Sequence, residues 1–213
     1  MPHFIVLDTE TTNSLDDPIM YDIGWAIINE KGEVLATRSY VVEEVFMNLE
    51  MMSSAYYADK RSLYWDGIED GSRIMTNLFT IRAQLLKDCK EYNVQFIAAH
   101  NARFDARSTR TTQRYLTKSR FRFFLPYGIE IWDTLKMARK AFSKDEKYTA
   151  FCDKYNYYTQ NHQKRFTAEI LYRFLTGNND FNEAHTGLED VLIEKEILMA
   201  CMERGVIDGR LYE

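Results

Sequence analysis

Three short segments of the sequence carry carboxylates where buried structure is expected. In the first, residues 4–12, four apolar residues are followed by Asp8 and Glu10. Such an apolar run, partly β-branched, is typical of a strand buried on both faces. Residues two apart on a strand point to the same side, and two neighbouring buried anions repel each other unless a cation lies between them. The pair fits a site for a divalent metal with oxygen ligands, Mg²⁺ or Mn²⁺, although a strand ending in a polar turn gives the same pattern.

The second segment is residues 100–105. Asn101 lies between a predicted strand and a predicted helix, where a helix N-cap belongs. Asp105 then falls in the first helical turn, near the positive end of the helix dipole and the carboxyl edge of the sheet, where ligands bind in open α/β folds. By itself, Asp105 is better explained as a carboxylate that only complements the dipole.

The third segment is residues 185–190. Thr186 followed by Glu189 is a capping-box pattern, which puts His185 just before a helix and Asp190 in its first turn. A helix that starts earlier, capped by Asp180, remains an alternative, but Gly187 would then lie inside it at a cost of about 1 kcal/mol relative to alanine.

Together these segments suggest a single site. Four carboxylates can hold two divalent cations about 4 Å apart, an arrangement suited to displacement at phosphorus. A histidine titrates near neutral pH and could take a proton from an attacking water.

The elements that must position these residues follow from hydrophobic periodicity and turn residues. Successive strands at 4–7, 20–29 and 34–42 are expected to be antiparallel neighbours. Strands at 94–99 and 129–132 follow helices and should be parallel to the first. Residues 43–71 fit a helical cap on the sheet, or a lid whose aromatic rings stack on bases. The expected helices are 72–93 (capped by Ser72), one from about 102, 133–142, 166–175 and 187–203, with a loop at 143–163.

Composition places the chain among ordinary globular proteins and excludes several classes. Hydrophobic residues make up 46% and charged residues 28% of the 213 positions, so a packed α/β domain is expected rather than a disordered chain. Three scattered cysteines without paired spacing indicate reduced thiols and no zinc site. No apolar run of transmembrane length or signal peptide is recognised, which predicts a cytoplasmic protein with no membrane partner. The net charge of −5 disfavours tight non-specific duplex binding.

The three motifs, in this order, resemble those of the DEDD 3′–5′ exonucleases of the DEDDh subgroup, a proofreading-subunit-like branch of the ribonuclease H-like superfamily. They are Asp8-Thr9-Glu10, Asn101-x-x-x-Asp105 and His185-x-x-x-x-Asp190, and Trp132-Asp133-Thr134 also resembles the family's fifth strand. The resemblance implies one exonuclease domain over residues 1–213. Its expected fold is a mixed five-stranded sheet, three strands antiparallel and then two parallel, flanked by helices.

The resemblance also implies a mechanism. Asp8, Glu10, Asp105 and Asp190 would bind two Mg²⁺ or Mn²⁺ ions, and His185 would be the general base that activates water for attack on the terminal phosphodiester. The products would be nucleoside 5′-monophosphates, released from the 3′ end of single-stranded nucleic acid, with DNA favoured over RNA. The expected substrate contacts are Thr9, Thr11, Thr12, Asn101 and Phe104, and for the last two a capping or packing role explains the residue equally well.

Alternatives stay open at this level. The same chemistry could act on RNA 3′ ends, the chain could be a non-catalytic relative that binds nucleic acid or a polymerase or other replication partner, or it could be a metal-dependent phosphatase.

A basic stripe from Arg103 to Lys118 is predicted to face away from the metals. A better strand-holding surface is the tyrosine- and lysine-rich segment, with Tyr148, Tyr155, Tyr157, Tyr158, Lys154, Lys164 and Arg165. The oligomeric state is not predicted.

Overall fold

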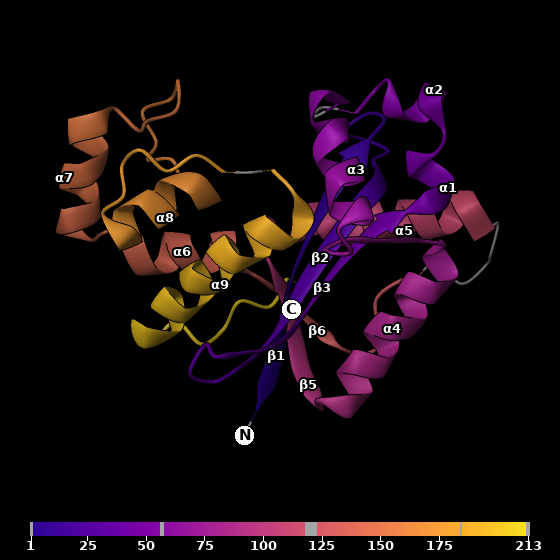
Figure 1. Cartoon of the computed structure of the whole chain (residues 1–213). Helices are drawn as coiled ribbons and strands as arrows, with labels where there is room; N and C mark the ends of the chain where they lie inside the picture. Colours follow the sequence, from indigo (N-terminus) through magenta and orange to yellow (C-terminus); the bar gives the residue numbers. More distant parts are fainter. Residues whose placement is uncertain (1, 56–57, 118–122, 184, 212–213) are drawn as a thin grey trace.

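The first strand, β1, lies inside a six-stranded mixed sheet whose order is β4-β3-β2-β1-β5-β6 (Figure 1). β1 pairs antiparallel with β2 and parallel with β5, while β2–β3 is antiparallel and β3–β4 and β5–β6 are parallel.

The computed structural model describes residues 2–55, 58–117, 123–183 and 185–211. The strands are β1 (His3–Thr12), β2 (Ile19–Asn29), β3 (Val34–Val42), β4 (Ile74–Thr76), β5 (Val94–Ala99) and β6 (Glu130–Asp133). The helices are α1 (Glu43–Phe46), α2 (Leu49–Met52), η1 (Ala58–Lys60), α3 (Arg61–Glu69), α4 (Leu78–Glu91), α5 (Arg103–Thr117), α6 (Thr134–Phe142), α7 (Glu146–Tyr155), α8 (Ala168–Thr176) and α9 (Gly187–Glu203).

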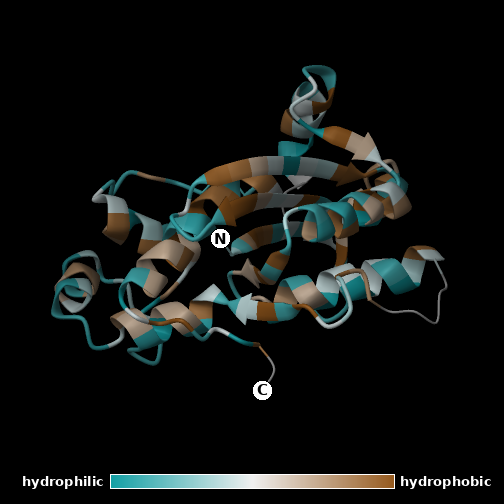
Figure 2. Ribbon diagram, turned by 90° about the horizontal axis from the view of Figure 1, so that it is seen from below, coloured by the Kyte–Doolittle hydropathy of each residue, from teal (hydrophilic) through white to brown (hydrophobic). Residues whose placement is uncertain are grey.

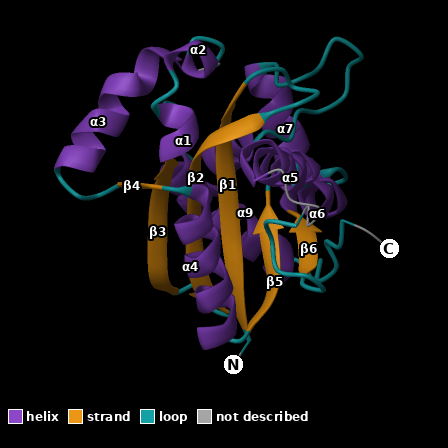
Figure 3. Cartoon of the chain, turned by 90° about the vertical axis from the view of Figure 1, so that its right-hand side faces the viewer, coloured by secondary structure: helices purple, strands orange, loops and turns teal. Residues whose placement is uncertain are grey.

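Side-chain alternation along β1 divides the core between the two faces of the sheet. Ile5 and Leu7 pack in the cluster that contains the buried residues of α4, whereas Phe4 and Val6 pack in the cluster that contains those of α6 and α9. Figure 3 shows α4 and α9 on opposite sides of the sheet. In Figure 2 hydrophobic colouring is concentrated along the strands, while the helices carry hydrophilic residues as well. A residue two positions beyond Val6 therefore faces α9.

The expected mixed sheet is confirmed, but the strand count was wrong by one. The additional strand is β4, a three-residue edge strand parallel to β3. We expected residues 74–76 to belong to a helix capped by Ser72. Instead the helix begins at Leu78, because the side chain of Asn77 accepts the Thr80 backbone N–H and acts as the N-cap.

Residues 143–163 were predicted to be a loop, and this was wrong. Asp145 accepts the Tyr148 backbone N–H at 2.8 Å and starts α7, and Asn156 ends the helix in a left-handed conformation with φ of 54°. The helix was missed because its sequence shows little hydrophobic periodicity. Only Tyr148 and Cys152, which lie one turn apart, are buried.

The expected helical cap over residues 43–71 is confirmed. It consists of α1, α2, η1 and α3, and it buries Phe46, Met52 and Tyr64 against the sheet. Within the described residues, no helix is long and apolar enough to cross a membrane.

A close approach between β2 and the start of α9 fixes the distance between the sheet and this helix. A Cβ atom built on Gly24 would lie 2.3 Å from the backbone nitrogen of Leu188, and one built on Gly187 would lie 2.7 Å from the backbone nitrogen of Gly24. Only glycine fits at both positions, because the neighbouring atoms belong to backbone and cannot rotate away. The N-terminus of α9 is therefore held directly against β2.

We expect Gly24→Ala to lower the free energy of unfolding by about 1–3 kcal/mol, the usual cost of overpacking, and to displace the start of α9. Urea unfolding with a tryptophan-fluorescence readout measures the loss. Gly71→Ala is the comparison, because a Cβ there meets nothing within 4 Å and only the φ of +80° opposes it. Gly24→Ala with wild-type stability would contradict the close approach.

Candidate active site

Asp8 and Glu10 continue the row of Phe4 and Val6 on the α9 face of β1. Both carboxylates are half-buried and line one wall of a cavity of about 720 Å³. Directly after Glu10 the pairing of β1 with β2 shifts register, so the regular ladder ends where the acids enter the cavity. The expectation that Asp8 and Glu10 share one side of the sheet agrees with this geometry.

The third acid, Asp105, comes from α5. Asp105 is only 4% exposed, and its Oδ1 accepts the hydroxyl of Thr9 at 2.8 Å. Thr9 points away from α9, so β1 delivers two acids to the cavity and, between them, a hydroxyl that orients a third. Asp105 was placed correctly in the first turn, but Asn101 is not the N-cap because α5 begins at Arg103. Asn101 adopts a left-handed φ of 64°, and its backbone N–H donates to Asp133 Oδ1 at 3.1 Å.

The last acid comes from the start of α9. Thr186 occupies the N-cap position, as expected, although its hydroxyl donates to the Glu189 carboxylate rather than accepting a backbone N–H. The Gly187 N–H donates instead to Asp22 Oδ2 on β2 at 2.8 Å. This contact and the glycine approach fix the first turn, which carries Asp190 into the cavity.

Arg73, between α3 and β4, supports the same helix start from outside. Its guanidinium donates to both oxygens of Glu189 at 2.8 Å and lies 3.7 Å from Asp22 Oδ2. The ring of Tyr64 lies 4.9 Å below the guanidinium carbon, and its hydroxyl donates to Asp22 at 2.8 Å. The helical cap therefore contributes directly to holding α9 in place.

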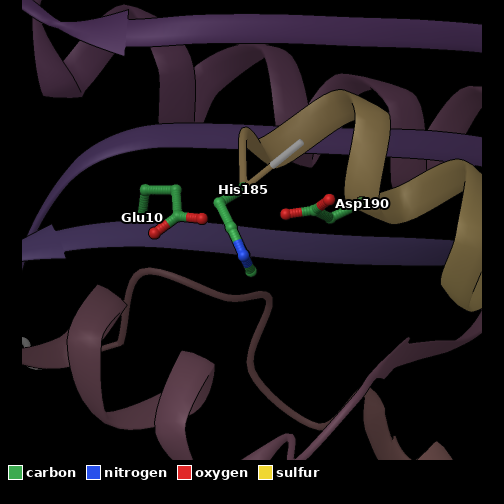
Figure 4. A group of neighbouring side chains, drawn as sticks. All are labelled: Glu10, His185 and Asp190. Atoms are coloured by element: carbon green, nitrogen blue, oxygen red, sulfur yellow. The ribbon is translucent and has the colours of Figure 1, made fainter. Parts of the chain in front are cut away.

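His185 lies between Glu10 and Asp190 (Figure 4). One ligand atom from each of these three residues lies within 4.8 Å of the others. The Asp190 Oδ1 atom is buried and finds no hydrogen-bond partner in the part of the chain that the structure describes. Oxygen donors at this spacing, one of them unsatisfied, fit a divalent cation.

The pKa values of the cavity carboxylates are all raised. Burial, with Glu194 and Asp105 nearby, raises the pKa of Asp8 well above its usual range. Burial also raises the pKa of Glu10 to about 9, that of Asp190 to about 8 and that of Asp105 to about 7. In each case burial is the largest cause, because an ionised carboxylate loses its hydration in the cavity.

The imidazole of His185 has the opposite shift. Its pKa is lowered, chiefly by burial and then by the positive charge of Lys60, so the ring is neutral at pH 7. Its Nδ1 atom lies 3.7 Å from Glu183 Oε2, and the backbone at His185 is left-handed with φ of 53°. A neutral imidazole beside the acids is able to accept a proton.

Two acidic residues at this cavity were missed by the sequence reading. Glu194 is 3% exposed, and its Oε2 accepts the backbone N–H of His100 at 3.0 Å. The signal was available, because Glu194 interrupts the apolar face of α9 one turn after Asp190. Glu183 also lines the cavity, and the sequence did not assign it to the site.

The remaining expected substrate contacts are distributed unevenly. Thr9, Asn101 and Phe104 line the cavity, whereas Thr11 and Thr12 are not among its lining residues. The Thr12 hydroxyl contacts the carbonyl of Met51 and lies 2.8 Å from Ser54 Oγ, so it is used in attaching the helical cap. The roles of Thr11 and Thr12 toward a substrate stay predictions.

The two basic surfaces predicted from the sequence differ in their position relative to the cavity. Arg103, Arg107, Arg110 and Arg114 are exposed on α5 and do not line the cavity, as the stripe prediction stated. Lys118, Arg120 and Arg122 lie outside the described residues. In the tyrosine-rich segment Lys164 and Arg165 do line the cavity, but Tyr148 is fully buried and cannot be part of a binding surface.

Comparison with known proteins identifies the fold. No protein-family model matches the sequence, and no curated protein matches it significantly. E. coli Exonuclease I with a dT13 oligonucleotide matches with a TM-score of 0.63 at 14% identity, over 96% of this chain and 41% of that one. A zinc-bound form of E. coli Exonuclease I with single-stranded DNA gives 0.59 at 14% identity, over 96% and 41%. Cell-death related nuclease 4 gives 0.60 at 12% identity, over 96% and 65%. The chain thus has the ribonuclease H-like exonuclease fold, as expected, and spans less than half of the Exonuclease I chain.

The raised carboxylate pKa values predict how stability depends on pH. Above about pH 5 the folded chain retains protons that the unfolded chain releases near pH 4, on Asp105 up to about pH 7, on Asp190 up to about pH 8 and on Glu10 up to about pH 9. Because the folded state binds more protons, the free energy of unfolding should fall as pH rises through this window. Urea unfolding in EDTA at several pH values measures the slope.

Asp190→Asn should make this slope shallower, because the amide does not ionise. Added Mn²⁺ should stabilise the wild type more at pH 8 than at pH 5, since the cation competes with the protons. A wild-type stability that does not change with pH in EDTA would show that the pKa values of these acids are not raised in the folded chain.

Proposed function

We propose that residues 1–213 form a 3′–5′ exonuclease domain of the DEDDh type, which removes nucleoside 5′-monophosphates from single-stranded nucleic acid, DNA in preference to RNA. The observation that carries the proposal is the convergence of Asp8, Glu10, Asp105 and Asp190 with His185 in one cavity, from three distant segments of the chain. The exonuclease fold, and the crystallisation of E. coli Exonuclease I with single-stranded DNA and with zinc, support it.

The four carboxylates would hold two divalent cations, Mg²⁺ or Mn²⁺. Their donor atoms are oxygens, burial and the neighbouring acids raise the pKa of Asp8 well above its usual range, and the buried Oδ1 of Asp190 is unsatisfied among the described residues. When bound, such ions lower the pKa of water and stabilise charge on the entering and leaving oxygens of a phosphodiester.

The other residues would handle the proton and the alignment. Neutral His185 accepts the proton of the attacking water, and Glu183, 3.7 Å from its Nδ1, stabilises the resulting imidazolium. The oxygen of the resulting hydroxide then becomes bonded to the terminal phosphorus, the bond from phosphorus to the 3′ oxygen of the preceding nucleotide breaks, and this leaving oxygen takes a proton from solvent. Thr9 keeps Asp105 in a fixed orientation, and Asp22 does the same for the start of α9 through Gly187.

A labelled single strand tests the direction and the product. With Mn²⁺, a 5′-labelled oligonucleotide should be shortened stepwise from its 3′ end, and chromatography should show nucleoside 5′-monophosphates. A matched RNA strand should be cut more slowly. Stepwise loss from the 5′ end, internal cutting, or hydrolysis of small phosphomonoesters alone would each refute the proposal.

Substitution of the cavity residues tests the assignment. Asp8→Asn and Asp190→Asn should reduce kcat/KM by about a thousandfold or more because they weaken metal binding, and His185→Gln by about a hundredfold to ten-thousandfold because the base is lost. Asp16→Asn, which changes an exposed carboxylate outside the cavity, is the matched control. Asp8→Asn with wild-type activity would exclude the two-metal site.

A further inference from the structure

A second cavity of about 800 Å³ adjoins the acidic one. The two share a wall made by Arg139, Thr159, Lys164 and Phe166, which line both. One side of the second cavity is α6 and the other is the turn that follows α7, where Tyr158 and Lys164 form a β-bridge. In Figure 1, α6, α7 and α8 gather on the same side of the sheet. The cavity continues the acidic site along this side of the molecule.

The charge of the lining changes sign across the shared wall. The acidic cavity carries six carboxylates, whereas the second is lined by Lys136, Arg139, Lys140 and Lys164 and by no acidic residue. We call these four residues the basic groove. Because the whole chain has a net charge of −5, this local excess of cations is not a reflection of overall composition.

Local sequence explains how α6 presents three of the cations together. Lys136, Arg139 and Lys140 have helical spacings of three and four, so they lie on one face. The opposite face carries the buried Met137 and Ala138, which attach α6 to the core. The orientation of the helix is thus fixed by its apolar side. On the groove side Lys136 and Lys140 donate to the carbonyls of Arg210 at 3.1 Å and Asp208 at 3.4 Å, which are neutral partners that leave the charge of both ammonium groups in place.

Two of the groove cations have charge that their protein partners do not neutralise. The Arg139 side chain is exposed and forms no hydrogen bond or ion pair with the described residues. The Lys164 ammonium donates only to neutral oxygens, the Ser143 carbonyl at 2.8 Å and the Thr149 hydroxyl, and therefore keeps one N–H donor. Both side chains lie at the shared wall, nearest the acidic cavity.

We propose that the basic groove binds the phosphates of a nucleic-acid strand on the 5′ side of the nucleotide that is removed. This inference rests on the proposed function, which puts the 3′-terminal phosphodiester among the acids. A strand whose end lies there must leave through a neighbouring opening, and a groove of cations with the half-buried rings of Tyr158 and Phe166 is typical of single-strand binding. An acidic peptide would share the charge but would not need the adjoining metal site.

Comparison of a long and a short substrate tests the groove. Arg139→Ala and Arg139→Ala/Lys140→Ala should raise KM for a dT12 oligonucleotide, about tenfold for the double variant, because charge-assisted phosphate contacts are lost. The loss on dT12 should exceed by several-fold the loss on the p-nitrophenyl ester of thymidine 5′-monophosphate, which has no upstream phosphates. The slope of log KM against log salt should become shallower by about 0.7 for each cation removed.

Arg114→Ala, which removes an exposed arginine on α5 outside both cavities, is the matched control and should leave both substrates unaffected. Arg139→Lys should recover part of the dT12 affinity. Equal losses in Arg114→Ala and Arg139→Ala, equal losses on the two substrates, or an unchanged salt slope would overturn the proposal.

Binding separates failure of this inference from failure of the proposed function. Fluorescence anisotropy of labelled dT12 in EDTA reports strand binding without any hydrolysis. Weaker binding by the double variant supports the groove even if the wild type cleaves neither substrate, an outcome that would refute only the nuclease. Unchanged binding in the double variant would refute the groove even if the wild type is an active exonuclease.

Discussion

Repulsion between carboxylates that are removed from water is the constraint to which the rest of the structure responds. Burial, together with neighbouring acids, raises the pKa values of Asp8, Glu10, Asp105 and Asp190, so the folded chain holds protons on them that a free chain would release. The fold keeps them together by fixing the backbone beneath each one. The strand ends, the helix starts and the glycine pair on β2 and α9 together oppose a repulsion that is removed when the acids bind protons or a cation.

The supporting contacts share one design, in which a neutral donor fixes an acid without neutralising it. Thr9 donates to Asp105, and the His100 backbone N–H donates to Glu194. The ring of His100 is bonded at both nitrogens, to Thr134 Oγ1 and to the Phe166 carbonyl, and burial lowers its pKa to about 4, so it brings no charge to the cavity. Guanidinium and ammonium groups lie at the wall shared with the basic groove, where Arg139 and Lys164 line both cavities. This segregation leaves the inner acids available to metal ions and the outer cations available to phosphates.

Much of this arrangement could be predicted from the sequence because it depends on local rules. Alternation along β1 put Asp8 and Glu10 on one face, and the capping pattern put Asp190 in the first turn of α9. Features set by tertiary contacts were missed. Among the described strands β4 pairs with β3 alone, at the edge of the sheet. Glu194 lies on a buried face of α9, where its carboxylate accepts the backbone N–H of His100, the residue after β5. The basic groove combines α6 with a turn that follows α7, and the sequence reading had no helix at α7.

Arg73 gives the region before β4 a significance beyond packing. Its guanidinium contacts the ring of Tyr64 in α3, Asp22 in β2 and Glu189 in the first turn of α9. The excursion between β3 and β4, residues 43–73, is therefore connected to the start of the helix that carries Asp190 and follows His185. This excursion is therefore not a detachable module. A minimal version of the protein made by joining β3 directly to α4 would retain every acid in the cavity yet lose the clamp on α9, and related chains that lack such an excursion must secure the same helix by other means.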